Sequence, residues 1–159
     1  GGHTQFGDHE DGKPSLGTIT PRMGSVSKSD FDFNNCPDLA QTVVVTCCAL
    51  DIPFHFKGLT SLKIKETDRI EALKRELRKV GYIVRSANDS ELIWDGTKCE
   101  PSMEPIDTYE DHRMAMAFAP LAIKFPGLAI NNPEVVSKSY PTFWDDLKSA
   151  GFTLEEITD

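Results

Sequence analysis

The chain has 159 residues, of which 39% are hydrophobic, enough for one domain with a sizeable core. Its formal net charge of −8 at pH 7 argues against nucleic acid as a partner, and it contains no apolar run of about 18 residues that would span a membrane. The four cysteines lack metal-ligand spacing, so we expect a reduced, cytoplasmic protein. Because the chain opens on Gly1-Gly2-His3 and not on Met, we expect it to be a piece of a longer protein.

The first half of the chain predicts alternating strands and helices. Residues 7–12 are acidic and turn-rich, which predicts a solvated hairpin tip, and residues 15–21 predict a strand or loop. A helix is expected over 37–50, because Pro37 suits a first helical turn and Cys47 and Cys48 fall in its apolar run. A strand at 53–59 and an amphipathic helix at 67–80 follow, with Thr67 as the expected N-cap and Gly81 as the stop signal.

The second half continues the alternation. Segments 82–85 and 91–94 predict a β-hairpin around 88–90, and 101–105 reads as a linker. A helix from Asp111 through the segment 114–125 is apolar nearly all round, so we expect it to be buried between other layers. A strand at 127–130 and a helix at 140–150, ended by Gly151, complete the chain. The pattern predicts one layered α/β domain, 1–159, with mixed sheets.

A period of 73 residues relates the two halves. The pairs separated by this spacing are Asp38 and Asp111, Pro53 and Pro126, and Lys65 and Lys138. Similarity at a fixed long period is typical of stacked supersecondary units. The spacing predicts two copies of one unit, each with an acid at the start of a buried helix and a lysine at the start of an amphipathic one.

The run Lys65-Glu66-Thr67-Asp68-Arg69 places four charged side chains at a predicted helix start. A helix N-terminus offers unpaired N–H groups and the positive end of the dipole, so Asp68 suits it, whereas Lys65 and Arg69 do not. Cations at that position are explained if an anion binds against them.

Structural explanations compete with this one. Glu66 and Arg69 have the spacing of a surface ion pair, Lys138 alone is typical of a solvated side chain, and Asp38 and Asp111 are ordinary helix-start acids. We interpret Asp111 as structural. A metal site at His112 with its neighbours Glu110 and Asp111, a second one at His3, Asp8 and His9, and catalysis by Cys36 or Cys99 are weaker alternatives.

Four motifs together resemble the 5-enolpyruvylshikimate-3-phosphate synthase family, also called 3-phosphoshikimate 1-carboxyvinyltransferase. They are Pro37-Asp38-Leu39-Ala40, Lys65-Glu66-Thr67-Asp68-Arg69, Asp111-His112-Arg113-Met114-Ala115-Met116 and Ser137-Lys138-Ser139-Tyr140-Pro141. The resemblance covers about residues 36–152. It implies a two-domain enzyme in which each domain holds three βαβαββ units, an inside-out α/β barrel, with helix N-termini facing an interdomain cleft. This chain would be most of the C-terminal-half domain.

The resemblance also implies the chemistry. The family transfers the enolpyruvyl group of phosphoenolpyruvate to the 5-hydroxyl of shikimate 3-phosphate and releases phosphate, without a metal or organic cofactor, in the shikimate pathway of aromatic amino acid biosynthesis. Glyphosate competes for the phosphoenolpyruvate position. We expect the chain alone to be inactive, because its partner is the missing N-terminal-half domain, and we expect the parent to be a monomer.

Residue roles follow by the same resemblance. Arg69, Arg113 and Lys138 would bind phosphoenolpyruvate. Asp38 would contact the hydroxyls of shikimate 3-phosphate and act as, or help, the base. Glu66 would protonate the methylene carbon, Lys65 would bridge Asp38 and Glu66 and bind shikimate 3-phosphate, and His112 would hydrogen-bond near Glu66 and the phosphate. Some family members carry Asn where this chain has Ser61, so Ser61 is not assigned to the site.

Two alternatives remain open. The related enolpyruvyl transferase that acts on UDP-N-acetylglucosamine shares the architecture, although the charged motifs point away from it. A piece of this kind is also consistent with a non-catalytic, anion-binding fragment.

Overall fold

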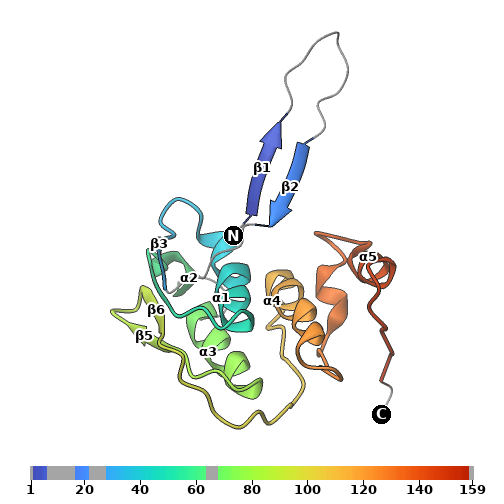
Figure 1. Ribbon diagram of the computed structural model, residues 1–159. Helices are drawn as coiled ribbons and strands as arrows, with labels where there is room; N and C mark the ends of the chain where they lie inside the picture. The colour runs from blue at the N-terminus through green and yellow to red at the C-terminus, as the bar shows by residue number, and fades with distance from the viewer. Residues whose placement is uncertain (1, 7–16, 22–27, 64–67, 158–159) are drawn as a thin grey trace.

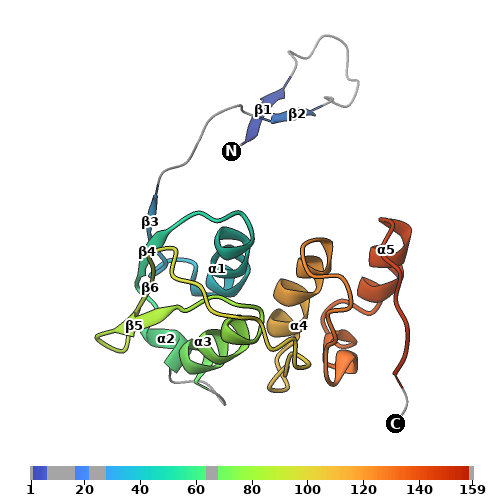
Figure 2. The same cartoon turned by 60° about the horizontal axis from the view of Figure 1, so that its bottom comes forward.

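The computed structural model describes residues 2–6, 17–21, 28–63 and 68–157. Its elements in chain order are β1 (Gly2–Phe6), β2 (Gly17–Pro21), β3 (Ser29–Asp32), η1 (Pro37–Leu39), α1 (Ala40–Ala49), β4 (Phe54–Lys57), α2 (Thr60–Lys63), α3 (Arg69–Lys79), β5 (Arg85–Ala87), β6 (Glu91–Trp94), α4 (His112–Phe118), η2 (Ala119–Ile123), η3 (Pro133–Val136) and α5 (Phe143–Ser149). A sheet, the helices α1 and α3, then α4 and finally α5 succeed one another across the molecule (Figures 1 and 2).

The main sheet has four strands in the order β3-β4-β6-β5. β3 pairs with β4 in parallel, and the other pairs are antiparallel, so the predicted mixed sheet is confirmed. A parallel pair needs a crossover connection, which η1 and α1 provide. Phe54, Phe56, Leu92 and Trp94 are buried on the helix-covered face of the sheet, with the rings of Phe54 and Phe56 stacked at 4.5 Å between centroids.

The predicted helices at 37–50 and 67–80 are both present with small corrections. The first begins as the short 3₁₀ turn η1 and continues as α1, and the expected strand 53–59 is β4. The N-cap of α3 is Asp68, whose Oδ1 accepts from the backbone N–H groups of Ile70 and Glu71, and not Thr67, which lies outside the described residues. α3 ends before Gly81, which has a φ of +96°, a left-handed conformation that glycine adopts without steric cost.

The hairpin after α3 is shifted from its expected position. Its second strand, β6, matches the prediction, but its first strand is β5 at 85–87 and not 82–85. Tyr82 forms only an isolated bridge, to Lys98, and its ring is buried against Trp94. The turn 88–90 is where the sequence predicts it, and Asn88 and Asp89 adopt positive φ there, which these residue types tolerate.

Two expectations for the later part of the chain are wrong. The helix from Asp111 does not run to residue 125, because α4 ends at Phe118 and the 3₁₀ helix η2 carries Pro120, which lacks the N–H that would continue α4. Residues 127–130 form no strand, only a parallel bridge between Ile106 and Ile130. The linker at 101–105 is confirmed as irregular.

α4 is buried on two sides, as its all-round apolar pattern predicts. Met114, Ala117 and Phe118 join the main core with α1 and α3, whereas Ala115, together with Ala119 of η2, packs against Val136 of η3 and Phe143 of α5. Near the N-terminus, β1 and β2 form the predicted hairpin, which projects from the layered body (Figures 1 and 2). Its predicted acidic tip lies outside the described residues.

Candidate active site

The starts of three helices meet at one place. Asp38 lies in the turn that precedes α1, Arg69 is the first residue of α3, and Arg113 is the second residue of α4. Asp38 Oδ2 lies 3.3 Å from Arg113 Nη2, and Asp38 Oδ1 lies 3.9 Å from Arg69 Nη1. Side chains separated by up to 75 positions in the sequence therefore form one cluster, which we call the arginine pair with Asp38.

Asp111 ties this cluster to the protein interior. Its Oδ1 accepts from the Arg113 backbone N–H at 2.9 Å as the N-cap of α4, and its Oδ2 accepts from Arg69 Nε at 2.7 Å and Gln41 Nε2 at 3.2 Å. The side chain is 7% exposed, and that of Arg69 is 14% exposed. This is the structural role that the sequence predicts for Asp111. Removing one partner of such a buried pair costs about 3–5 kcal/mol.

Arg69 has a donor left over for a further contact. At 3.9 Å its contact with Asp38 is electrostatic and too long for a hydrogen bond. Among the described residues, the buried Nη1 of Arg69 has no hydrogen-bond acceptor. Two guanidinium groups, one with a spare N–H, present the forked donors that suit a carboxylate or phosphate.

The turn that leads into Asp111 is strained. Tyr109 has φ +53° and Glu110 has φ +56°, and the Asp111 N–H donates to the Thr108 carbonyl at 2.9 Å. This is the geometry of a type I′ turn, which favours Gly, Asn or Asp at its two central positions. Left-handed conformations of other residues cost about 1–3 kcal/mol each and occur where surrounding contacts hold them, often at functional sites.

Glu76 supplies such contacts from within α3. This carboxylate is fully buried, and it accepts from Tyr109 O–H at 2.7 Å, the Asp107 N–H at 3.0 Å and Lys79 Nζ at 2.7 Å. Neither Glu76 nor Tyr109 was predicted from the sequence. The available signal was that Glu76 falls within the i, i+3, i+4 apolar stripe of its helix, where a charge requires partners.

The pKa values around Glu76 agree with this arrangement. Burial, followed by the hydrogen bond to Glu76, raises the pKa of Tyr109. Burial opposes the charged form of Lys79, but its bonds to Glu76 and Asp107 outweigh this and raise its pKa. The hydrogen bond from Asn131, followed by that from Lys79, lowers the pKa of Asp107.

The remaining predicted site residues lie outside the arginine pair with Asp38 or outside the described residues. Lys65 and Glu66 lie outside the described residues. His112 is the first residue of α4 and is half-buried beside Arg113. Lys138 is exposed in a turn after η3 and is not at a helix start, because α5 begins only at Phe143. Within the described residues Lys138 forms no ion pair with Asp38, and Ser61 is an exposed residue of α2.

Of the two alternative metal sites, the one at His112 gains no support, whereas the one at His3, Asp8 and His9 includes residues that lie outside the described residues. No three His, Cys, Asp or Glu side chains of the described residues lie close enough together to hold a metal ion. Burial raises the pKa of Cys47 and Cys48, as expected for inert core thiols. No helix within the described ranges has the length and apolar character needed to cross a lipid bilayer.

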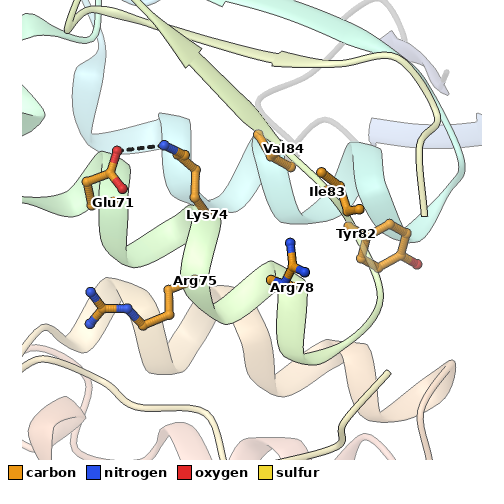
Figure 3. A pocket seen from close by; sticks show the side chains of 7 residues that line it. All are labelled: Glu71, Lys74, Arg75, Arg78, Tyr82, Ile83 and Val84. Atoms are coloured by element: carbon orange, nitrogen blue, oxygen red, sulfur yellow. Dashed lines mark hydrogen bonds and ion pairs between the residues drawn. The ribbon is translucent and has the colours of Figure 1, made fainter. Parts of the chain in front are cut away.

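A pocket of about 220 Å³ lies elsewhere on the molecule, along the side of α3 (Figure 3). Its lining residues are Glu71, Lys74, Arg75, Arg78, Tyr82, Ile83 and Val84, and no predicted site residue is among them. Lys74 is held there by Glu71 at 2.7 Å and Ser86 at 3.0 Å. The pocket is therefore separate from the arginine pair with Asp38.

Several known proteins are similar to this chain in sequence. A profile of the family described as EPSP synthase (3-phosphoshikimate 1-carboxyvinyltransferase) matches residues 11–147. A protein of that name from Bacteroides fragilis is 62% identical over 131 residues, which cover 82% of this chain and 32% of the relative. Others from Shewanella woodyi and Vibrio cholerae are 39% and 37% identical over 127 residues, each covering 80% of this chain and 29% of the relative. The chain spans about a third of the length of these curated relatives, and it belongs to the EPSP synthase family.

Proposed function

We propose that this chain supplies one wall of the active site of a 3-phosphoshikimate 1-carboxyvinyltransferase, the wall that binds phosphoenolpyruvate. The observation that carries the proposal is the convergence of Arg69 and Arg113 at the starts of two helices, next to Asp38. Phosphoenolpyruvate has a carboxylate and a phosphate, so it needs several convergent cations. The names of the relatives, which specify transfer of a carboxyvinyl group to 3-phosphoshikimate, support this choice of substrates.

The reaction needs an acid, a base and anion binding. The 5-hydroxyl oxygen of shikimate 3-phosphate bonds to C2 of phosphoenolpyruvate, loses its proton to a base, and the methylene carbon gains a proton from an acid. The C2–O bond to phosphate then breaks, phosphate leaves, and the methyl group returns a proton to restore the vinyl ether. Asp38 is proposed as the base and Glu66 as the acid, with Lys65 and His112 next to the substrates and Lys138 as a third cation for phosphoenolpyruvate.

The position of Asp38 fits a double role. Its carboxylate contacts both guanidinium groups, so a substrate anion that binds Arg69 and Arg113 competes with Asp38 for the same donors. Binding of phosphoenolpyruvate would then turn Asp38 toward a neighbouring hydroxyl.

We also propose that the chain contains the repeated βαβαββ units of an inside-out barrel. Segment 29–94 has this order, as β3, α1, β4, α3, β5 and β6. Residues 106–149 show the start of the same order. Ile106 lies before α4 in the chain and Ile130 lies after it, and the two residues form a parallel bridge. The register supports the repeat, since Ile106 and Ile130 lie 73 positions after Phe33 and Lys57, where Phe33 N–H donates to the Lys57 carbonyl at 2.8 Å. The whole chain would be most of the C-terminal-half domain of a cytoplasmic, monomeric enzyme.

Kinetics on the full-length protein test the proposal. The expected result is phosphate release that requires both phosphoenolpyruvate and shikimate 3-phosphate, with no release when UDP-N-acetylglucosamine replaces shikimate 3-phosphate. This chain alone, purified free of host enzyme, should show no turnover, because the opposite wall of the cleft is missing. Turnover with the UDP-sugar, or by the isolated chain, would contradict the proposal.

A variant of Glu66 tests its role as the proton donor. Glu66→Gln keeps the size of the side chain but removes the proton, so kcat should fall by roughly 10²–10⁴-fold while both substrates still bind. Solvent deuterium should enter the methyl group of the addition intermediate more slowly in a single turnover. Normal kcat and normal labelling would remove Glu66 from the role of acid and make Lys65 the leading candidate.

A further inference from the structure

Two type I′ turns in this protein differ in how they are stabilised. In the β5–β6 hairpin, the central residues are Asn88 and Asp89, with φ values of +50° and +54°, and these residue types accept that conformation by themselves. In the turn 108–111 the central residues are Tyr109 and Glu110, which do not. The second turn therefore depends on contacts with the rest of the fold.

Those contacts come from α3. Glu76 accepts hydrogen bonds from the Tyr109 hydroxyl at 2.7 Å and from the Asp107 N–H at 3.0 Å, so one buried carboxylate holds the chain just before the turn and within it. Asn131 Nδ2 donates to Asp107 Oδ1 at 2.8 Å, and Arg75 Nη1 reaches the Tyr109 hydroxyl at 3.3 Å. Glu110 is exposed.

The same helix carries Arg69 at its first residue. Glu76 follows seven residues later, about 10 Å along the helix axis. From Glu76 the contacts continue through Tyr109 and the turn to Asp111, whose Oδ2 returns to Arg69 Nε at 2.7 Å. This closed ring of contacts leaves little freedom in the placement of Arg113, whose N–H bonds to Asp111 Oδ1 at 2.9 Å.

We propose that Tyr109, held by Glu76, is a positioning residue that keeps the turn 108–111 in its left-handed conformation and so fixes Arg113 relative to Arg69. Tyr109 does not touch the substrate. It acts through the turn and through Asp111. The kinetic part of this proposal rests on the proposed function, whereas its structural part does not.

Tyr109→Phe in the full-length protein is the decisive variant, because it keeps the ring that packs on the core and removes only the hydroxyl. The amide protons of Asp111 and Arg113 should exchange with solvent roughly tenfold faster, as expected for loss of one hydrogen bond to a charged group. The KM for phosphoenolpyruvate should rise about three- to tenfold, with a smaller change for shikimate 3-phosphate.

Rescue distinguishes positioning from general loss of stability. Glu110→Gly removes the Cβ that disfavours positive φ, so the double variant Tyr109→Phe/Glu110→Gly should recover most of both effects. Tyr82→Phe is the matched control, since Tyr82 is a buried tyrosine whose ring centroid lies 5.7 Å from Lys124 Nζ and which lies outside the ring of contacts. It should lower the unfolding midpoint without changing the exchange at Asp111 or the KM for phosphoenolpyruvate.

Three results would overturn the proposal. The first is unchanged exchange in Tyr109→Phe, the second is faster exchange with an unchanged KM for phosphoenolpyruvate, and the third is a double variant as impaired as Tyr109→Phe. If the wild-type protein shows no transferase activity, the proposed function fails independently. The exchange rates of Tyr109→Phe and of the double variant then decide the positioning role by themselves.

Discussion

The starts of α3 and α4 have the same local design but depend on different parts of the molecule. Each begins with an aspartate N-cap, Asp68 or Asp111, and carries an arginine in its first turn. Asp68 Oδ1 accepts from two N–H groups of its own helix, at 3.1 and 3.2 Å. Asp111 accepts from its helix and also from Arg69 of α3 and Gln41 of α1. The same residue type thus caps one helix and, at the other, joins three helices.

Alanine substitution at the two caps should give the largest difference. Asp111→Ala removes a cap and leaves Arg69, at 14% exposure, without its buried partner, so the free energy of unfolding of the full-length protein should fall by about 3–5 kcal/mol. Asp68→Ala removes only capping bonds and should cost about 1 kcal/mol. Urea denaturation measures both. Equal losses would show that Asp111 acts as a local cap alone.

The next largest effect is expected on substrate binding when Arg113, the arginine that follows the Asp111 cap, is replaced. Arg113→Ala should raise the KM for phosphoenolpyruvate by roughly 10- to 100-fold, the scale of a lost charge-assisted bond, and change the KM for shikimate 3-phosphate far less. Arg78→Ala, an exposed arginine on the side of α3, is the matched control and should leave both values unchanged. Steady-state kinetics on the full-length protein measure them. A larger effect at Arg78 than at Arg113 would refute the assignment.

Asparagine substitutions separate capping from charge. Asn caps a helix about as well as Asp, so Asp68→Asn should change the free energy of unfolding by no more than about 0.5 kcal/mol. Asp111→Asn keeps the cap but loses the ionic bond to Arg69, and it should cost about 1–3 kcal/mol. Thermal or urea unfolding tests the pair. If Asp111→Asn is as mild as Asp68→Asn, the bond to Arg69 adds no stability.

The smallest expected effect is a pH dependence at the α4 start. Bonds from Asn131 and Lys79 lower the pKa of Asp107, so its contribution to stability is complete above the unfolded-state pKa of about 3.9 and disappears as pH falls through the lower folded-state pKa. Asp107→Asn should therefore lose stability less steeply than wild type below about pH 4. Urea midpoints measured from pH 6 down to pH 2.5 test this. Parallel curves would contradict it.

Local patterns in the sequence were sufficient for most elements. Apolar spacing and stop signals predicted α1, α3 and β6, and the uniform apolar character of the α4 segment predicted burial on two sides. The errors occurred where local signals were weak or competed. Asp68 rather than Thr67 caps α3, Pro120 shortens α4, and residues 127–130 pair only through one bridge.

Residues only a few positions apart were enough to predict the family motifs, the amphipathic helices and the acidic residues at helix starts, because these features depend on near neighbours in the chain. Which charged side chains come into contact depends on how the helices pack. Asp38, Arg69 and Arg113 are brought together only by the packing of α1, α3 and α4, and the burial of Glu76 becomes tolerable only when Tyr109 and Lys79 reach it. Ion pairs and buried hydrogen bonds act over a few ångströms in space, and one sequence read alone does not show which distant residues become neighbours.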